Sequence, residues 1–100
     1  MTDDEHEFTM ACRRAMAECR SLGYVPSIWI RMVDEHGAVE TARRLVMSGD
    51  LQDGLLKLLR LGRADLTIEH AVLAERWHDL FTDEEREVAR WRLEIAQPEK

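Results

Sequence analysis

The sequence predicts an all-α fold, a compact bundle of about five to six helices joined by short capped turns. Apolar residues recur at spacings of three and four along most of the chain, and no longer stretch alternates like a strand. Only two prolines occur, and 45% of the 100 residues are hydrophobic, which fits one packed domain. We expect residues 1–100 to form a single helical domain, with an N-terminal helix in 1–23 and a helical core in 24–97.

The first predicted helix runs from about residue 3 to residue 22. Thr2 and Glu5 have the spacing of a capping box, and Gly23 suits the C-terminal stop. The apolar stripe of this helix comprises Phe8, Ala11, Cys12, Ala15, Cys19 and Leu22. Small side chains, Ala11, Cys12 and Ala15, make up its middle part. Because small residues allow close approach, this helix can pack on another helix of the chain or on a second copy.

Three more helices are predicted before residue 62. Ser27 suits the N-cap of the second helix, and Gly37 its end. The apolar stripe of that helix comprises Ile28, Trp29, Met32, Val33 and His36. The third spans about 38–47, with Val39, Ala42, Leu45 and Val46 on its apolar side. Ser48-Gly49-Asp50 separates it from the fourth, at about 51–61, whose leucines cover more than half its circumference and predict a central position.

The stretch GRADLTIEH, residues 62–70, reads as one helix end followed by another helix start. Gly62 suits the stop of the fourth helix, and Thr67 the N-cap of a fifth helix at about 68–74. Arg63 is expected to interact with Asp65 or Glu69 and hold this turn.

The final helix begins after Thr82. Thr82 and Glu85 repeat the capping-box spacing, and Pro98 marks the end of the helix. Its predicted buried stripe comprises Val88, Trp91 and Ile95.

The charge distribution disfavours some function classes. A net charge of −6 opposes a general role on nucleic acid, where neutralisation of phosphates dominates affinity. A local basic stretch nevertheless lies within residues 43–63: Arg43, Arg44, Lys57, Arg60 and Arg63. No apolar run approaches the ~18–20 residues that span a bilayer, and the acidic N-terminus does not resemble a signal peptide. We therefore expect a cytoplasmic protein with no membrane partner.

Neither a metal site nor an active site is predicted. The possible soft ligands lack the short spacing of a zinc site: His6, Cys12, Cys19, His36, His70 and His78. The two cysteines would lie about 10 Å apart on one helix, too far for a disulfide, so we expect both to be reduced and buried. Glu69 and His70 are adjacent and point in different directions on a helix. There is also no nucleophile motif or phosphate loop. We expect no enzyme activity and no cofactor.

One resemblance covers about residues 24–93. It is carried by Gly37-Ala38-Val39-Glu40, Gly54-Leu55, Gly62-Arg63-Ala64-Asp65-Leu66-Thr67 with Glu69, Trp77, Leu80-Phe81-Thr82, Ala89-Arg90 and Leu93. In these residues the chain resembles a family of small all-helical bacterial domains of unassigned function. The resemblance implies a bacterial origin and an all-helical fold, and it supplies no catalytic or ligand residues.

Tryptophan and arginine favour an interaction surface, because both are enriched where interfaces concentrate their energy. Trp29 and Trp91 lie on helical stripes and are expected in the core, whereas Trp77 beside Arg76 fits core and surface equally. We expect a non-enzymatic interaction or regulatory module that binds another protein or a second copy of itself. The expected contact surfaces are the basic stretch and the region of Arg76 and Trp77.

The alternative is a DNA-binding regulator of transcription, phage or defence functions. The third and fourth predicted helices resemble a helix-turn-helix in length. In that case Arg43 and Arg44 would contact the backbone and Gln52 would read a base.

Overall fold

The computed structural model describes residues 3–48 and 53–96, which form six α-helices and two short 3₁₀ helices and contain no strand. The α-helices are α1 (Asp3–Ser21), α2 (Ser27–His36), α3 (Ala38–Val46), α4 (Asp53–Arg60), α5 (Ile68–Leu73) and α6 (Asp83–Ile95). The 3₁₀ helices are η1 (Ala64–Leu66) and η2 (Glu75–Leu80). The all-α fold class is therefore confirmed. Within the described part of the chain, no helix is both long and apolar enough to cross a membrane.

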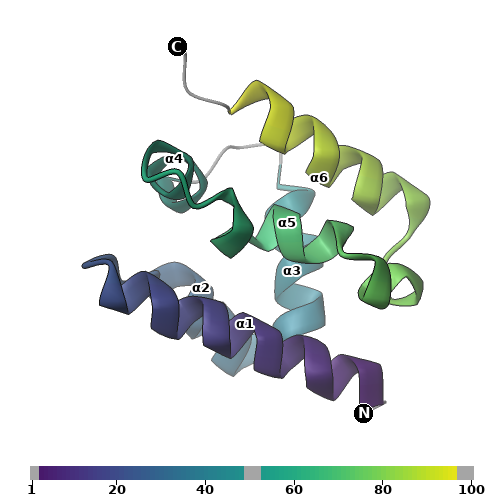
Figure 1. Cartoon of the computed structure of the whole chain (residues 1–100). Helices are drawn as coiled ribbons and strands as arrows, with labels where there is room; N and C mark the ends of the chain where they lie inside the picture. The colour runs from purple at the N-terminus through teal and green to yellow at the C-terminus, as the bar shows by residue number, and fades with distance from the viewer. Residues whose placement is uncertain (1–2, 49–52, 97–100) are drawn as a thin grey trace.

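The helices pack around α3 and α5. Figure 1 shows α1 on one side of the molecule and α6 on the other, with α3 and α5 between them. Helix α3 contacts α1, α2, α5 and α6, and α5 packs along α6. The prediction that the leucine-rich fourth helix is central was wrong, because α4 lies at the edge and its main contact is with η1. Leu55, Leu58 and Leu59 share its buried face, whereas Leu61 beyond its end is 46% exposed.

The main core joins α1 to the rest of the chain. Phe8 of α1 is fully buried and packs edge-on against two rings, with its centroid 5.6 Å from that of Trp77 and 5.3 Å from that of Phe81. The remaining buried residues of this core come from every α-helix except α4: Cys12, Met16, Trp29, Val33, Ala38, Ala42, Val46, Ile68, Val72 and Ala89. The N-terminal helix is thus an integral layer of the fold.

Local capping interactions end and start the helices largely where the sequence predicts. Gly23 and Gly62 have positive φ, and the residue after each donates to a carbonyl five residues back, as in a Schellman motif. The Thr67 hydroxyl accepts from the backbone N–H of His70, and Thr82 forms a complete capping box with Glu85. These predictions are confirmed.

One predicted cap is wrong. Ser27 is the first residue of α2, Pro26 occupies the N-cap position, and no side chain caps this end. The carbonyl of Pro26 already accepts from Ile30, so the helix begins one residue earlier than predicted. The predicted roles of Thr2, Gly49, Asp50 and Pro98 lie outside the described residues.

The predicted buried stripe of the last helix is wrong at two of its three residues, since Val88 packs against the main core but Trp91 and Ile95 do not. Trp91 is 57% exposed and Ile95 is 47% exposed, whereas Ala89 and Arg92 are buried. The inward face of α6 is therefore rotated by about one residue from the apolar stripe. Arg92 turns inward because it forms a hydrogen bond with Glu69, which lies on α5.

Candidate functional site

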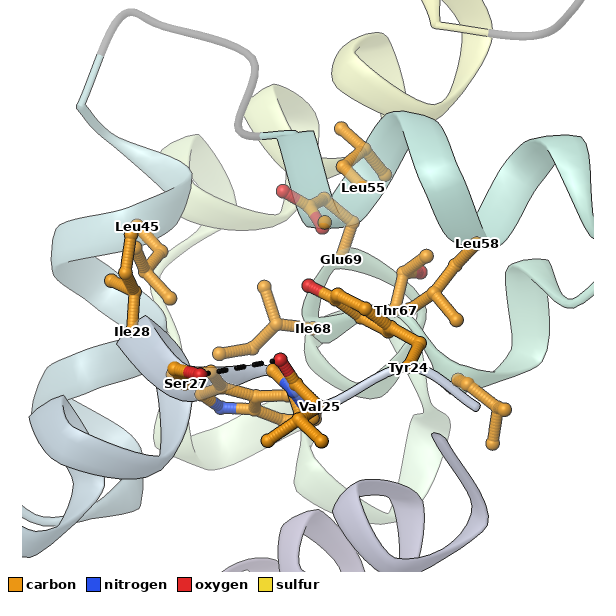
Figure 2. A pocket seen from close by; sticks show the side chains of 14 residues that line it. Tyr24, Val25, Ser27, Ile28, Leu45, Leu55, Leu58, Thr67, Ile68 and Glu69 are labelled. Atoms are coloured by element: carbon orange, nitrogen blue, oxygen red, sulfur yellow. Dashed lines mark hydrogen bonds between the residues drawn. The ribbon is translucent and has the colours of Figure 1, made fainter. Parts of the chain in front are cut away.

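A solvent-open pocket of about 470 Å³ lies between the start of α2, helix α4 and the segment from η1 into α5. Residues 24–29 form one side, Leu55 and Leu58 another, and residues 66–69 a third. Figure 2 shows Tyr24, Ile68 and Leu45 around its interior, with Glu69 in its wall. The volume falls in the range of ligand pockets in proteins, about 300–1,000 Å³.

The rim of this pocket is apolar and exposed. Val25 is 53% exposed and Ile28 is 59% exposed, although both are large hydrophobic residues. Pro26 between them fixes the backbone of the link, and Tyr24 closes the opposite end. The sequence assigned Ile28, Trp29 and Val33 to one buried stripe of α2. Trp29 and Val33 are buried as predicted, but the assignment of Ile28 was wrong because it lies on the exposed side of the helix.

Gly54 lets Tyr24 approach α4 closely. A Cβ at position 54 would overlap the Tyr24 hydroxyl, so only glycine leaves room for the ring in this position. The ammonium of Lys57 lies 5.5 Å from the centroid of the same ring, at cation–π distance. Tyr24 is therefore placed from two sides by α4.

Glu69, one of the polar residues that line the pocket, belongs to a buried ion pair. Nε of Arg92 donates to Oε2 of Glu69 at 2.8 Å, and the exposed fractions of the two side chains are 2% and 1%. A buried carboxylate is tolerated because the guanidinium compensates its charge. The sequence predicted that Arg63 would interact with Asp65 or with Glu69; the bond to Asp65 is confirmed, Arg63 also bonds to Glu18, and Glu69 pairs with Arg92.

Trp29 also lines the pocket and carries an unused donor. The residue is 8% exposed, and its indole Nε1 has no hydrogen-bond partner within the described parts of the chain. A buried donor without a partner is unfavourable by about 1–3 kcal/mol.

The predicted basic stretch does not form one surface. Arg43 donates to the carbonyl of Leu80 at 2.7 Å and lies 3.6 Å from the Glu85 carboxylate. Arg44 pairs with Glu40 at 3.8 Å. These arginines therefore face carboxylates at the side of the molecule where α3 meets the start of α6.

The charge of Arg63 is compensated by carboxylates at another part of the molecule, the turn before α5. Its guanidinium makes two hydrogen bonds of 3.1 Å to the carboxylate of Asp65. This contact holds the pKa of Asp65 below its usual value, with the charge of Arg63 as a further cause. Arg63 is thus a positioning residue of the turn that the sequence predicts here.

Lys57 is the member of the stretch that the structure places at the pocket, because its ammonium lies at cation–π distance from the ring of Tyr24, which lines it. Lys57 and Arg60 are both exposed on α4, and neither has a carboxylate at ion-pair distance among the described residues. Their helix supplies Leu55 and Leu58 to the pocket. One residue predicted for partner binding therefore adjoins an apolar hollow that the sequence did not reveal.

The predicted pair Arg76 and Trp77 is placed differently. The Trp77 ring is 4% exposed and packs in the main core, so it offers no indole to a partner. The Arg76 guanidinium lies 4.5 Å from the centroid of this ring and pairs with Glu7 of α1. Both side chains hold η2 against α1, and the exposed tryptophan is Trp91.

Two kinds of reactive group can be examined among the described residues: metal ligands and cysteine thiols. No group of three or more His, Cys, Asp or Glu side chains that could hold a metal occurs within residues 3–48 and 53–96. Burial raises the pKa of the Cys12 thiol to about 12 and also raises that of Cys19. Neither cysteine is an activated nucleophile in this state, because a nucleophilic thiol needs a lowered pKa.

No protein-family model, no curated protein and no solved structure matches this chain. The resemblance of residues 24–93 to small bacterial helical domains stays a prediction. The site has to be interpreted from its own geometry.

Sequence reasoning missed the pocket because its residues come from separate segments. One local signal was present: Tyr24-Val25-Pro26 is an apolar link that no helical stripe uses. Exposed apolar residues in a link indicate a binding surface, because a segment that only connects two helices does not need them. Which helices would face this link could not be read from spacing.

Proposed function

We propose that this chain is a non-enzymatic interaction module that binds an acidic, amphipathic protein segment in the pocket between α2, α4 and α5. The observation that carries the proposal is the open apolar pocket whose rim exposes Val25 and Ile28. A regulatory role through such binding fits a small domain with no assembled reactive centre among its described residues.

The apolar character of the pocket defines the core of the bound segment. Contiguous exposed apolar residues mark interaction sites on small proteins. Amphipathic helices commonly place their apolar anchors in grooves of this kind. The occupant is therefore a segment with two or more large apolar side chains on one face.

The charge around the pocket defines the flanks of the bound segment. Lys57 and Arg60 lie on the α4 side, and Arg31 lies one helical turn after Ile28 on the α2 side. None of these three cations forms an ion pair with a described carboxylate, although the whole chain has a net charge of −6. Complementary charge at an interface favours carboxylates on the partner.

The test is an affinity pull-down from lysate of the source cell with three baits: the natural chain, Ile28→Asp and Met10→Asp. Met10 is the matched control, because it is 45% exposed on α1 and does not line the pocket. Lysates are treated with nuclease and washed at moderate salt. Each retained protein is identified and its binding to the purified chain is then measured directly.

The proposal predicts a protein that the natural chain and Met10→Asp retain after nuclease treatment and that Ile28→Asp loses. Direct binding of that purified protein should weaken at least tenfold for Ile28→Asp. Retention of the same proteins by all three baits would exclude the pocket as the binding site.

The DNA-binding alternative has less structural support. Arg43 is occupied by the Leu80 carbonyl and Glu85, and Gln52 lies outside the described residues. Recovery of nucleic acid that is lost on nuclease treatment, and that Arg44→Glu no longer retains, would favour this alternative.

A further inference from the structure

The outer face of α6 carries an exposed apolar pair. Trp91 is 57% exposed and Ile95, one turn later on the same face, is 47% exposed. Tryptophan is the residue most enriched in the energetic centres of interfaces, and a half-exposed Trp–Ile pair is unfavourable in water. This face therefore has the features of a binding surface.

Carboxylates flank this apolar pair. Glu87 lies one turn before Trp91 and Glu94 one turn after it, and both are exposed. Glu87 pairs with Arg90 on the same helix, and no described cation pairs with Glu94. The outer face of α6 is thus an acidic amphipathic segment with two large apolar anchors.

Within one molecule this face points away from the pocket. Arg92 is directed inward to Glu69, which lies in the pocket wall. Trp91 precedes Arg92 by one residue and therefore points about 100° away around the helix. Helix α6 packs along α5 and lies above it in Figure 1, and Trp91 and Ile95 are on its exposed side, so they can contact the pocket of another molecule.

We infer that the outer face of α6 in one copy docks into the α2–α4–α5 pocket of a second copy. Trp91 and Ile95 enter the pocket, and Glu94 faces Lys57, whose ammonium lies over the ring of Tyr24 at the pocket. This inference rests on the proposed function and names the partner. Each copy offers one pocket and one α6 face, so two copies form two equivalent contacts in a symmetric dimer.

Sedimentation equilibrium over a range of protein concentrations tests this inference with three single variants. The natural chain is expected to dimerise, and the dimer should weaken with salt because exposed charges are screened. Trp91→Ala and Ile28→Asp should each weaken dimerisation at least tenfold, while Met10→Asp leaves it unchanged. Positions 91, 28 and 10 are all exposed, so all three variants are expected to fold, which circular dichroism checks.

Mixing the two weakened variants provides the decisive measurement. Trp91→Ala retains an intact pocket, and Ile28→Asp retains an intact α6 face. Their mixture should therefore form a one-to-one complex through a single contact, although neither variant associates alone. A contact of Trp91 with Trp91, or of Ile28 with Ile28, would produce no such complex.

A monomeric natural chain, a dimeric Trp91→Ala variant or a mixture that stays monomeric would each overturn this inference. The proposed function fails separately. If the natural chain is monomeric while Ile28→Asp loses a captured protein that Trp91→Ala retains, the pocket binds a different partner. If Ile28→Asp loses neither self-association nor any captured protein, both proposals are wrong.

Discussion

Nε of Arg92 on α6 lies 2.8 Å from Oε2 of Glu69 on α5, and the two side chains are among the most deeply buried in the molecule. This pair connects the helix that exposes Trp91 to the helix that lines the pocket. The rotation of α6 about its own axis follows from it, because Arg92 must face inward to reach Glu69.

The first prediction concerns this ion pair. Glu69→Ala removes the Glu69 carboxylate from the buried Arg92 guanidinium and should lower the free energy of unfolding by about 3–5 kcal/mol. Urea unfolding followed by tryptophan fluorescence measures the change. The double variant Glu69→Leu with Arg92→Met removes both charges and should recover much of the loss. Equal losses in the single and double variants would show that the pair itself is not responsible.

The second prediction concerns the cap of α5. The Thr67 hydroxyl accepts from His70 N at 3.1 Å and donates to the carbonyl of Ala64 at 2.7 Å, and the residue is 3% exposed. Thr67→Ala should cost about 1–2 kcal/mol of stability in thermal or urea unfolding. Thr67→Ser keeps both hydrogen bonds and is the control, with a smaller loss. An unchanged stability for Thr67→Ala would contradict this role of the hydroxyl.

The third prediction concerns the junction of α2 and α3. Gly37 has φ 83° and ψ 161°, a conformation essentially restricted to glycine. Gly37→Ala should therefore destabilise the fold by about 1–3 kcal/mol, although nothing fills the space around this residue. Gly62→Asn is the comparison, because the left-handed conformation of a Schellman motif tolerates asparagine. Similar losses at both positions would argue against backbone strain as the cause.

The fourth prediction concerns stability at alkaline pH. Burial raises the pKa of Cys12 to about 12, while an unfolded thiol has a pKa near 8.5. Above about pH 9 the unfolded chain loses the proton that the folded chain keeps, so this contribution to stability is present at lower pH and declines as pH rises. Unfolding free energies of the natural chain should fall more steeply between about pH 9 and 11 than those of Cys12→Ala. Parallel pH dependence in the two proteins would refute this.

Much of the secondary structure could be predicted because helix ends depend on neighbours within a few residues. Gly23 and Gly62 end helices through local backbone bonds, and Thr67 and Thr82 cap helices through residues three positions later. The incorrect N-cap prediction for Ser27 also has a local cause, because the carbonyl of the preceding proline accepts the first helical hydrogen bond. Even there the start of α2 was wrong by one residue only.

The candidate site was less predictable because its contacts join distant parts of the chain. Arg76 pairs with Glu7, 69 residues away. Arg43 pairs with Glu85, so the basic stretch does not form one common surface. Spacing alone could not show that Lys57 would lie at an apolar pocket with no ion pair to any described carboxylate.

The sequence by itself determined an all-helical chain and most of its helix boundaries, since propensity, capping and glycine geometry act locally. The tertiary structure decided which side of each helix faces the core. Periodicity placed Trp91 inside, but one long-range ion pair turned Arg92 inward in its place and left Trp91 exposed. The pocket likewise exists only where three separate segments meet, because a cavity is a property of packing rather than of any one helix.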